Sequence, residues 1–363
     1  MRINALKNRR GVALIIVMVA IFTLMVLAGG FAYTMKVEMR LARNHGSETD
    51  LEWLGRSGVE LARYLVVQQL STPERAYHAL NQKWAGGTGV TNDIFQNIQL
   101  ENNELGNGVF SIKIVDLERK FNINSADPAI LQQAMNLMGV DPVEASSAID
   151  GILDWRDADN EPRFNGAESE YYERLNPPYF AKNGPIDDLS ELLLIKGITP
   201  EMYWGPGNPN AGLSVNVANL KPGRRGGRNA RNADKPATIQ SGLIDLFTPI
   251  SGRLVNINTA SASVLQLVPM IDANMAQAIV NMRAGPDQVA GNEDDTPFDK
   301  LGELVNVPGM PRQLVQQAVR YFAVNSQTFE VTVDARVGTY RRLYVATLRV
   351  NGRDAQILNF YWK

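Results

Sequence analysis

Acidic side chains gather in one short stretch of this 363-residue chain. Asp157, Asp159 and Glu161 stand at alternate positions, and Glu168 follows further along. This order reproduces the carboxylate spacing of an EF-hand calcium loop. Pro162 stands where that loop requires glycine, and flanking EF-type helices are not evident. The stretch therefore predicts a cation site with oxygen ligands but without EF-hand geometry.

A second acidic loop lies in the C-terminal half of the chain. Neither loop has a histidine or cysteine nearby, and ligand sets made only of oxygen favour calcium over zinc. The residues alone leave two interpretations open: Ca²⁺ as a structural cofactor, or helix caps and solvated surface carboxylates without a bound ion. The candidate ligands of the second loop are Asp287, Asn292, Asp294 and Asp295, with Glu293 between them.

Candidates for catalysis are few. The chain has no cysteine, which excludes a thiol nucleophile and a disulfide scaffold. Its two histidines, His45 and His78, have no evident triad partners, and no P-loop or dinucleotide fingerprint is present. We expect that the protein is not an enzyme. The net charge of −2 gives no general argument for a nucleic-acid partner.

The N-terminus combines a basic flank with a long apolar run. Residues 1–10 carry four basic side chains and no acid, and residues 11–35 carry no charge. About 20 apolar residues suffice for a helix to cross a bilayer, and the basic flank predicts a cytoplasmic N-terminus. The helical pattern continues to Ser71, which predicts a helix about 90 Å long. Such a length suits a membrane stalk or a packed filament, and an ordinary anchor followed by a separate helix is the alternative.

The remaining pattern predicts an α+β fold. We expect the long N-terminal helix to pack on a small antiparallel sheet, which a large, mostly helical insertion interrupts. Residues 109–117 alternate like a strand, and three more strands follow near Phe329, Leu343 and Ile357. Turns at Gly338-Thr339 and Asn351-Gly352 connect them. The expected segments are a leader (1–11), the helix (12–72), a first sheet part (73–119), the insertion (120–323) and the last strands (324–363).

The insertion contains an internal repeat. The hexapeptide Phe121–Ala126 recurs as Val255–Ala260, and its Asn-x-Asn-(Ser/Thr)-Ala motif is expected to cap a helix in each unit. The two units are expected at about 120–203 and 253–323. A basic linker rich in Gly, Pro and Asn, at about 205–236, is expected to be a loop between them; its charge suits either solvation or an acidic partner surface.

The second unit resembles helix-hairpin-helix DNA-binding domains, including those of competence proteins. Such hairpins bind phosphate through backbone amides of a Gly-x-Gly turn. Here the turn spans 268–272 without glycine, and Asp272 would repel a phosphate. We therefore expect no nucleic-acid partner, although a membrane-tethered DNA-binding protein of an uptake system remains the alternative function.

Several segments together resemble a known family. The stretch RRGVALIIVMVAIF is similar to the leader and mature start of type IV pilin-like proteins. With FNINSA, DGILDWRDAD, GAESEYYE, DDLSELLLIKGI and VNINTASASVL, the chain resembles the minor pseudopilin K family of type II secretion systems. The resemblance implies cleavage between Gly11 and Val12 by a prepilin peptidase, methylation, a single pass through the bacterial inner membrane, and a C-terminal domain in the periplasm.

The resemblance also implies a place in the assembly. Most pilin-like subunits have a glutamate where this chain has Ile16, and that carboxylate neutralises the N-terminal amine of a neighbouring subunit. A subunit without a neighbour above it needs no such glutamate, which suits the tip of a pseudopilus that exports folded proteins. The implied partners are the minor pseudopilins of the I and J families, the inner-membrane assembly platform and the membrane. A minor pilin of a type IV pilus is a further alternative.

Finally, the resemblance implies a calcium-binding helical domain. Its matching motifs carry the candidate ligands, and the second acidic loop is a weaker candidate. The ligands of the first site would come from Asp154, Asp157, Asp159, Glu161 and Glu168.

Overall fold

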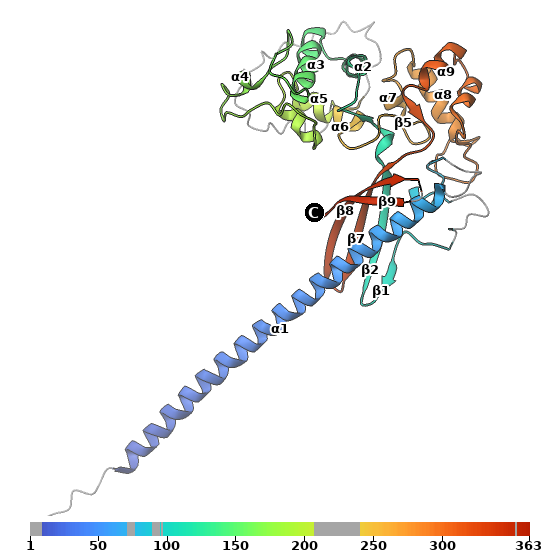
Figure 1. Cartoon of the computed structure of the whole chain (residues 1–363). Coiled ribbons are helices and arrows are strands. Elements are labelled where there is room, and N and C mark those ends of the chain that lie inside the picture. The colour runs from blue at the N-terminus through green and yellow to red at the C-terminus, as the bar shows by residue number, and fades with distance from the viewer. Residues whose placement is uncertain (1–8, 71–76, 89–94, 96, 207–239, 353) are drawn as a thin grey trace, which may run out of the picture.

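A long helix and a sheet form one end of the molecule, and a helical insertion forms the other (Figure 1). The computed structural model describes residues 9–70, 77–88, 95, 97–206, 240–352 and 354–363. Helix α1 (Arg9–Leu70) is 62 residues long and runs diagonally into the sheet. The predicted continuous helix is therefore present.

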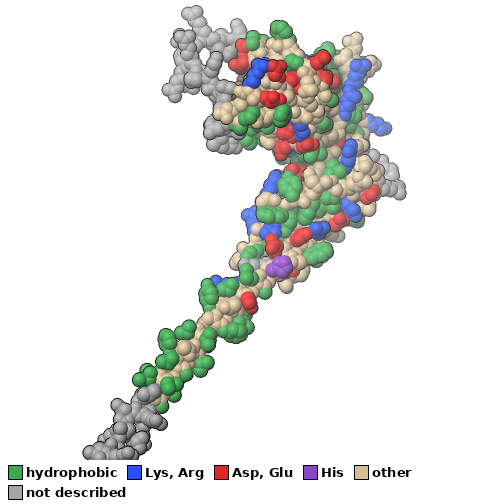
Figure 2. All heavy atoms as spheres, turned by 60° about the vertical axis from the view of Figure 1, so that its left-hand side comes forward, with side chains coloured by type: hydrophobic (Ala, Val, Ile, Leu, Met, Phe, Trp, Pro, Cys, Tyr) green, Lys and Arg blue, Asp and Glu red, His purple; other side chains and the backbone are tan. Residues whose placement is uncertain are grey.

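Two segments of α1 have opposite surroundings. Its apolar side chains from Leu14 to Leu41 are exposed, and they form the green surface along the free part of the helix in Figure 2. From Leu51 onward one face of the helix is buried. This face packs on the strands as part of a core that includes Leu54, Val59, Leu65 and Val66.

The sheet has five strands in the order β1-β2-β7-β8-β9, all paired antiparallel. The predicted fold class is confirmed, and β1 is a strand that the sequence pattern did not indicate. Turns at Gly338 and Gly352, both with positive φ, connect the last three strands as predicted. The strands are β1 (Asn103–Leu105), β2 (Gly108–Asp116), β7 (Thr328–Val337), β8 (Tyr340–Asn351) and β9 (Asp354–Trp362).

The insertion leaves the sheet after β2 and returns before β7. Because Asp116 and Phe329 are direct partners in the sheet, the insertion begins and ends at neighbouring positions. Its helices are α2 (Pro128–Met138), α3 (Pro142–Arg156), α4 (Ser169–Tyr172), α5 (Pro200–Trp204), α6 (Leu243–Leu246), α7 (Ala262–Leu265), α8 (Ala273–Arg283) and α9 (Arg312–Ala318).

A short parallel strand pair closes each repeat unit. Strand β3 (Phe121–Asn122) pairs with β4 (Phe247–Thr248), and β5 (Val255–Asn256) pairs with β6 (Phe322–Ala323). The first unit therefore continues to Thr248, beyond the predicted limit near residue 203. Buried side chains of both units form a single hydrophobic core.

The predicted basic linker belongs inside the first unit rather than between the units. Its flanking residues Gly205 and Gly242 approach so closely that a Cβ atom on Gly242 would lie 2.3 Å from the Gly205 amide nitrogen. Residues 207–239, which hold most of the predicted linker, lie outside the described residues.

The predicted helix-capping role of the Asn-x-Asn motif is wrong. The side chain of Asn124 instead pairs with the backbone of Ile186, accepting from its amide (2.7 Å) and donating to its carbonyl (2.8 Å). Asn258 pairs with Phe298 in the same way, at 2.9 and 3.0 Å. The second asparagine of each motif therefore ties its unit to a loop about 40 to 60 residues downstream, a long-range contact that local sequence does not reveal.

A buried polar layer joins the insertion to the sheet. Asp116, at the end of β2, accepts hydrogen bonds from Asn256 (3.1 Å), Thr259 (2.5 Å) and Ser326 (2.7 Å). His78 is fully buried beside this group, and its Nδ1 accepts from the Ser326 amide at 2.9 Å. Because these hydrogen bonds are buried away from water, they favour one arrangement of the sheet and the insertion.

Candidate cation site

The first acidic stretch forms a compact group of three carboxylates. Asp157, Asp159 and Glu168 each offer an oxygen, and these oxygens lie within 4.8 Å of one another. Asp157 follows α3 directly, and Glu168 precedes α4, so the loop between these helices folds back on itself. Calcium–oxygen distances are about 2.3–2.6 Å, so ligand oxygens about 5 Å apart can share one ion.

Part of this group has no hydrogen-bond partner inside the protein. Both side-chain oxygens of Glu168 and Oδ1 of Asp157 are buried and unpartnered. Glu168 is only 4% exposed. Burial, reinforced by the charges of Asp154, Asp157 and Asp159, raises the pKa of Glu168 to about 7. A buried carboxylate oxygen without a donor costs free energy, and a bound cation would remove that cost.

Two other predicted ligands lie outside the three-carboxylate group. Asp154 is fully buried, and its oxygens accept from the backbone amide of Arg163 (3.1 and 3.3 Å) and from its guanidinium (2.7 Å). Glu161 is exposed, and its backbone amide donates to Asp159 Oδ1 at 2.9 Å. The carboxylate of Asp154 is thus already satisfied, and Glu161 serves the loop through its main chain.

The structure adds two residues that the spacing of acids did not reveal. Arg163 also donates to Asp157 Oδ2 at 2.6 Å, so its guanidinium bridges two carboxylates. Asn183 donates to the carbonyl of Asp159 at 2.6 Å, and its own Oδ1 is buried without a partner. Asn183 comes from a distant loop, so only the fold brings it here.

The second acidic loop is not brought together in this way. Both oxygens of Asp287 are engaged, by the Val289 amide (2.8 Å) and by the Asn292 side chain (2.7 Å). Asp294 accepts from the Asp287 amide at 3.3 Å, and Asp295 accepts from the Gly291 amide at 2.8 Å, while the other oxygen of Asp295 and Oδ1 of Asn292 are buried without a partner. Among the described residues, the first loop alone places three carboxylates within reach of one ion.

The hairpin of the second repeat unit carries its own acceptor at the helix start. Asp272 is the N-cap of α8, and its Oδ1 accepts from the Met275 amide at 2.8 Å. This carboxylate therefore takes an amide of the first turn that a phosphate would otherwise use. Met270, at the turn, has a φ of +76° and is 66% exposed.

The predicted processing site lies at the start of α1. Gly11 and Val12 fall within this helix, but their side chains are outside the described part of the chain. Ile16 is exposed on the free part of the helix. Among the described helices, α1 is long and apolar enough to cross a membrane, with a mean hydropathy of 2.7 in its most apolar window.

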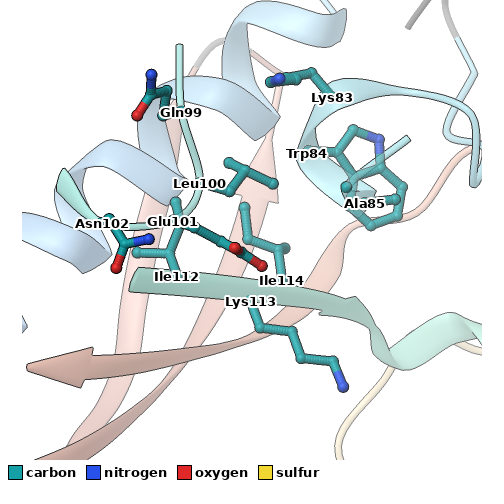
Figure 3. A pocket seen from close by; sticks show the side chains of 11 residues that line it. Lys83, Trp84, Ala85, Gln99, Leu100, Glu101, Asn102, Ile112, Lys113 and Ile114 are labelled. Atoms are coloured by element: carbon teal, nitrogen blue, oxygen red, sulfur yellow. The ribbon is translucent and has the colours of Figure 1, made fainter. Parts of the chain in front are cut away.

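A groove of about 560 Å³ lies beside strand β2 (Figure 3). Trp84, Leu100, Ile112 and Ile114 line it, and Lys113 extends away from it. Lys83, Gln99, Glu101 and Asn102 also line it, so polar and apolar side chains share the lining.

Comparisons with known families match two parts of the chain. The model described as "Type II secretion system (T2SS), protein K" matches residues 109–204, which include the three-carboxylate loop. The helix-hairpin-helix motif model matches residues 251–323, the second repeat unit.

Similar proteins cover most of the chain. Type II secretion system protein K of Klebsiella pneumoniae is 26% identical over 60% of this chain and 68% of that protein. Its Pseudomonas aeruginosa counterpart is 24% identical over 97% of this chain and 91% of that protein. Among solved structures, the crystal structure of the GspK-GspI-GspJ complex from enterotoxigenic Escherichia coli contains a similar chain. The two chains have a TM-score of 0.60 and are 16% identical, and the match covers 89% of this chain and 99% of that chain.

Proposed function

We propose, from the premise that this chain belongs to the protein K family of the type II secretion system, that it starts and caps the pseudopilus as its tip subunit. In this role it is a structural assembly protein without catalytic activity. It is anchored in the inner membrane by α1, with the sheet and the insertion in the periplasm.

The position of the insertion carries the proposal. The apolar, exposed part of α1 leaves the sheet on one side, and the insertion lies beyond the other end of the helix (Figure 1). Filament subunits pack through such helices, so a partner below can use the free part of α1. A further subunit above would meet the insertion. The missing carboxylate at Ile16 agrees with a subunit that has no neighbour above it.

The assembly role can be tested by co-purification with the partner proteins. We expect the full chain, co-expressed with the I- and J-family pseudopilins of its own system and purified in detergent, to be recovered as a stable ternary complex. Consistently monomeric protein would contradict the proposal.

Capping can be tested separately from assembly. Because the insertion begins and ends next to the paired residues Asp116 and Phe329, residues 120–323 can be replaced by a short turn. This variant should still bind its partners, which shows that the sheet has folded, but it should allow longer filaments than the wild type when the major subunit is overproduced. Unchanged filament length in a variant that binds its partners would exclude a capping role for the insertion.

The same chain is proposed to hold a structural calcium ion. Asp157, Asp159 and Glu168 would be the protein ligands, and the unpartnered oxygens of Glu168 support the assignment. The bound ion would supply the positive charge that lets these three carboxylates stay close together between α3 and α4.

Calorimetry and thermal unfolding test this site. Ca²⁺ should raise the melting temperature of the full chain, and EDTA should lower it. The substitution Glu168→Gln should abolish calcium uptake, whereas Asp294→Asn in the second loop is the matched control and should leave it unchanged. The opposite pattern would move the site to the second loop.

A further inference from the structure

The guanidinium of Arg163 stands beside the proposed ion site as a second positive charge. Its Nη1 atom lies 2.7 Å from Asp154 Oδ1 and 2.6 Å from Asp157 Oδ2. Asp157 therefore uses one oxygen for Arg163, while its other oxygen is buried without a partner. One carboxylate thus links the arginine to the three-carboxylate group.

The contacts of Arg163 change the net charge of the carboxylate site. Asp154, Asp157, Asp159 and Glu168 carry four negative charges when they are ionised, and Arg163 is the cation that pairs with two of them. Close like charges repel strongly unless a cation compensates them. The arginine supplies part of this compensation permanently, because its pKa lies above that of any other side chain.

The contact is also held in place by the main chain. The backbone amide of Arg163 donates to both oxygens of the fully buried Asp154, at 3.1 and 3.3 Å. The side chain of Arg163 is 41% exposed to water, whereas the side chain of Asp154 is fully buried. The residue is therefore fixed at its backbone, and its charge lies at the rim of the site.

We propose that Arg163 is a built-in counter-cation that lowers the calcium affinity of this site and stabilises the loop when no ion is bound. This inference rests on the proposed calcium site. The positive charge of the arginine repels a divalent ion next to Asp157. When no ion is bound, the same charge offsets the repulsion between the carboxylates and so stabilises the folded loop. The site thereby becomes a moderate-affinity one, in which ion binding adds to a loop that is already folded.

Two substitutions separate charge from geometry. Arg163→Gln removes the charge and keeps a shorter polar side chain, whereas Arg163→Lys retains the charge. Arg174→Gln is the matched control, since Arg174 is a strongly exposed arginine of the same region that pairs with Glu170 instead.

The test measures calcium binding by calorimetry and melting temperature in EDTA, on the full chain in detergent. For Arg163→Gln we expect calcium to bind about tenfold more tightly, as removal of one unit charge near a divalent ion predicts. Its melting temperature in EDTA should fall by a few degrees, because the carboxylates then repel one another without a compensating cation. Arg163→Lys and Arg174→Gln should match the wild type in affinity.

The outcomes distinguish the inference from the site on which it rests. If the wild type takes up no Ca²⁺, the proposed site and this inference both fail. If the wild type binds Ca²⁺ but Arg163→Gln binds it no more tightly, or more weakly, the site stands and the role of Arg163 is overturned.

Discussion

Arg156 and Arg283 occupy matching positions at the ends of α3 and α8, and each clamps the loop that opens its own repeat unit. Arg156 donates to the carbonyls of Ile123 (2.6 Å) and Ala126 (2.8 Å). Arg283 donates to the carbonyls of Ile257 and Ala260. The two repeat units therefore share this arginine-to-carbonyl hydrogen bonding as well as their sequence similarity.

Replacing Arg283 by lysine should destabilise the protein. Arg283 is 6% exposed, and burial lowers its pKa to about 10. A lysine cannot reach two carbonyls with a planar fork, so Arg283→Lys should lower the free energy of unfolding by about 1–3 kcal/mol. The exposed Arg320→Lys is the control and should change it by less than about 0.5 kcal/mol. Equal effects of the two substitutions in chemical denaturation would contradict the clamp.

Replacing Met270 by glycine should stabilise the protein. Met270 has a φ of +76°, and the corresponding turn of the first unit has Gly139 at +73°. A side chain in this left-handed region costs about 1 kcal/mol, so Met270→Gly should raise the melting temperature by a few degrees. The reverse change, Gly139→Met, should lower it. A lower melting temperature for Met270→Gly would show that the exposed methionine makes a stabilising contact.

Two glycines of α1 test how closely the helix packs on the sheet. A Cβ atom on Gly58 would lie 2.5 Å from Val333 Cγ1, whereas a Cβ on Gly46 would meet nothing. Gly58→Ala should therefore lower the free energy of unfolding by about 1–3 kcal/mol through overpacking. Gly46→Ala should leave it unchanged or raise it by up to about 1 kcal/mol, since alanine is the better helix former. Similar shifts for both variants in thermal unfolding would mean that the helix can move away from the sheet.

The junction between sheet and insertion should make stability depend on pH. Burial, together with the charge of Asp116, raises the pKa of Glu118 to about 7 from its ordinary value of 4.5. The folded state therefore holds this proton more tightly than the unfolded state, and the resulting stabilisation is present below pH 4.5 and lost as the pH rises to 7. Glu118→Gln cannot lose a proton, so its stability relative to the wild type should increase across that window and then level off.

The titration of His78, at the same junction, changes the stability of the protein with pH in the opposite direction. Burial lowers its pKa to about 3 from 6.5, so the unfolded state binds the proton more tightly and the His78 contribution to stability grows as the pH rises from 3 to 6.5. The two slopes oppose each other in the wild type. Denaturation curves between pH 4 and 8 should accordingly show a steeper rise for Glu118→Gln than for the wild type. Parallel curves would exclude Glu118 as a titrating group.

Patterns that repeat locally were predictable from the sequence alone. The uncharged run after a basic flank determined α1, because a helix of that length satisfies its own backbone wherever it lies. Alternation and glycine turns predicted β2 and the last three strands, and the repeated hexapeptide predicted two related units. Strand β1 was missed because three residues are too short for alternation to show.

Contacts across long stretches of chain required the tertiary structure. The pairing of β3 with β4 extended the first unit to Thr248, and it joins segments more than 100 residues apart. The acidic spacing indicated a cation site, but only the fold decided that Glu168 is buried without a donor, that Asp154 is already satisfied and that Arg163 bridges to Asp157. The sequence determined which charged side chains the loop contains. Only the folded chain decided which of these charges remain uncompensated. The reason is that the free energy of a charge depends on its burial and on the distance to its partners, and neither is a local property of the sequence.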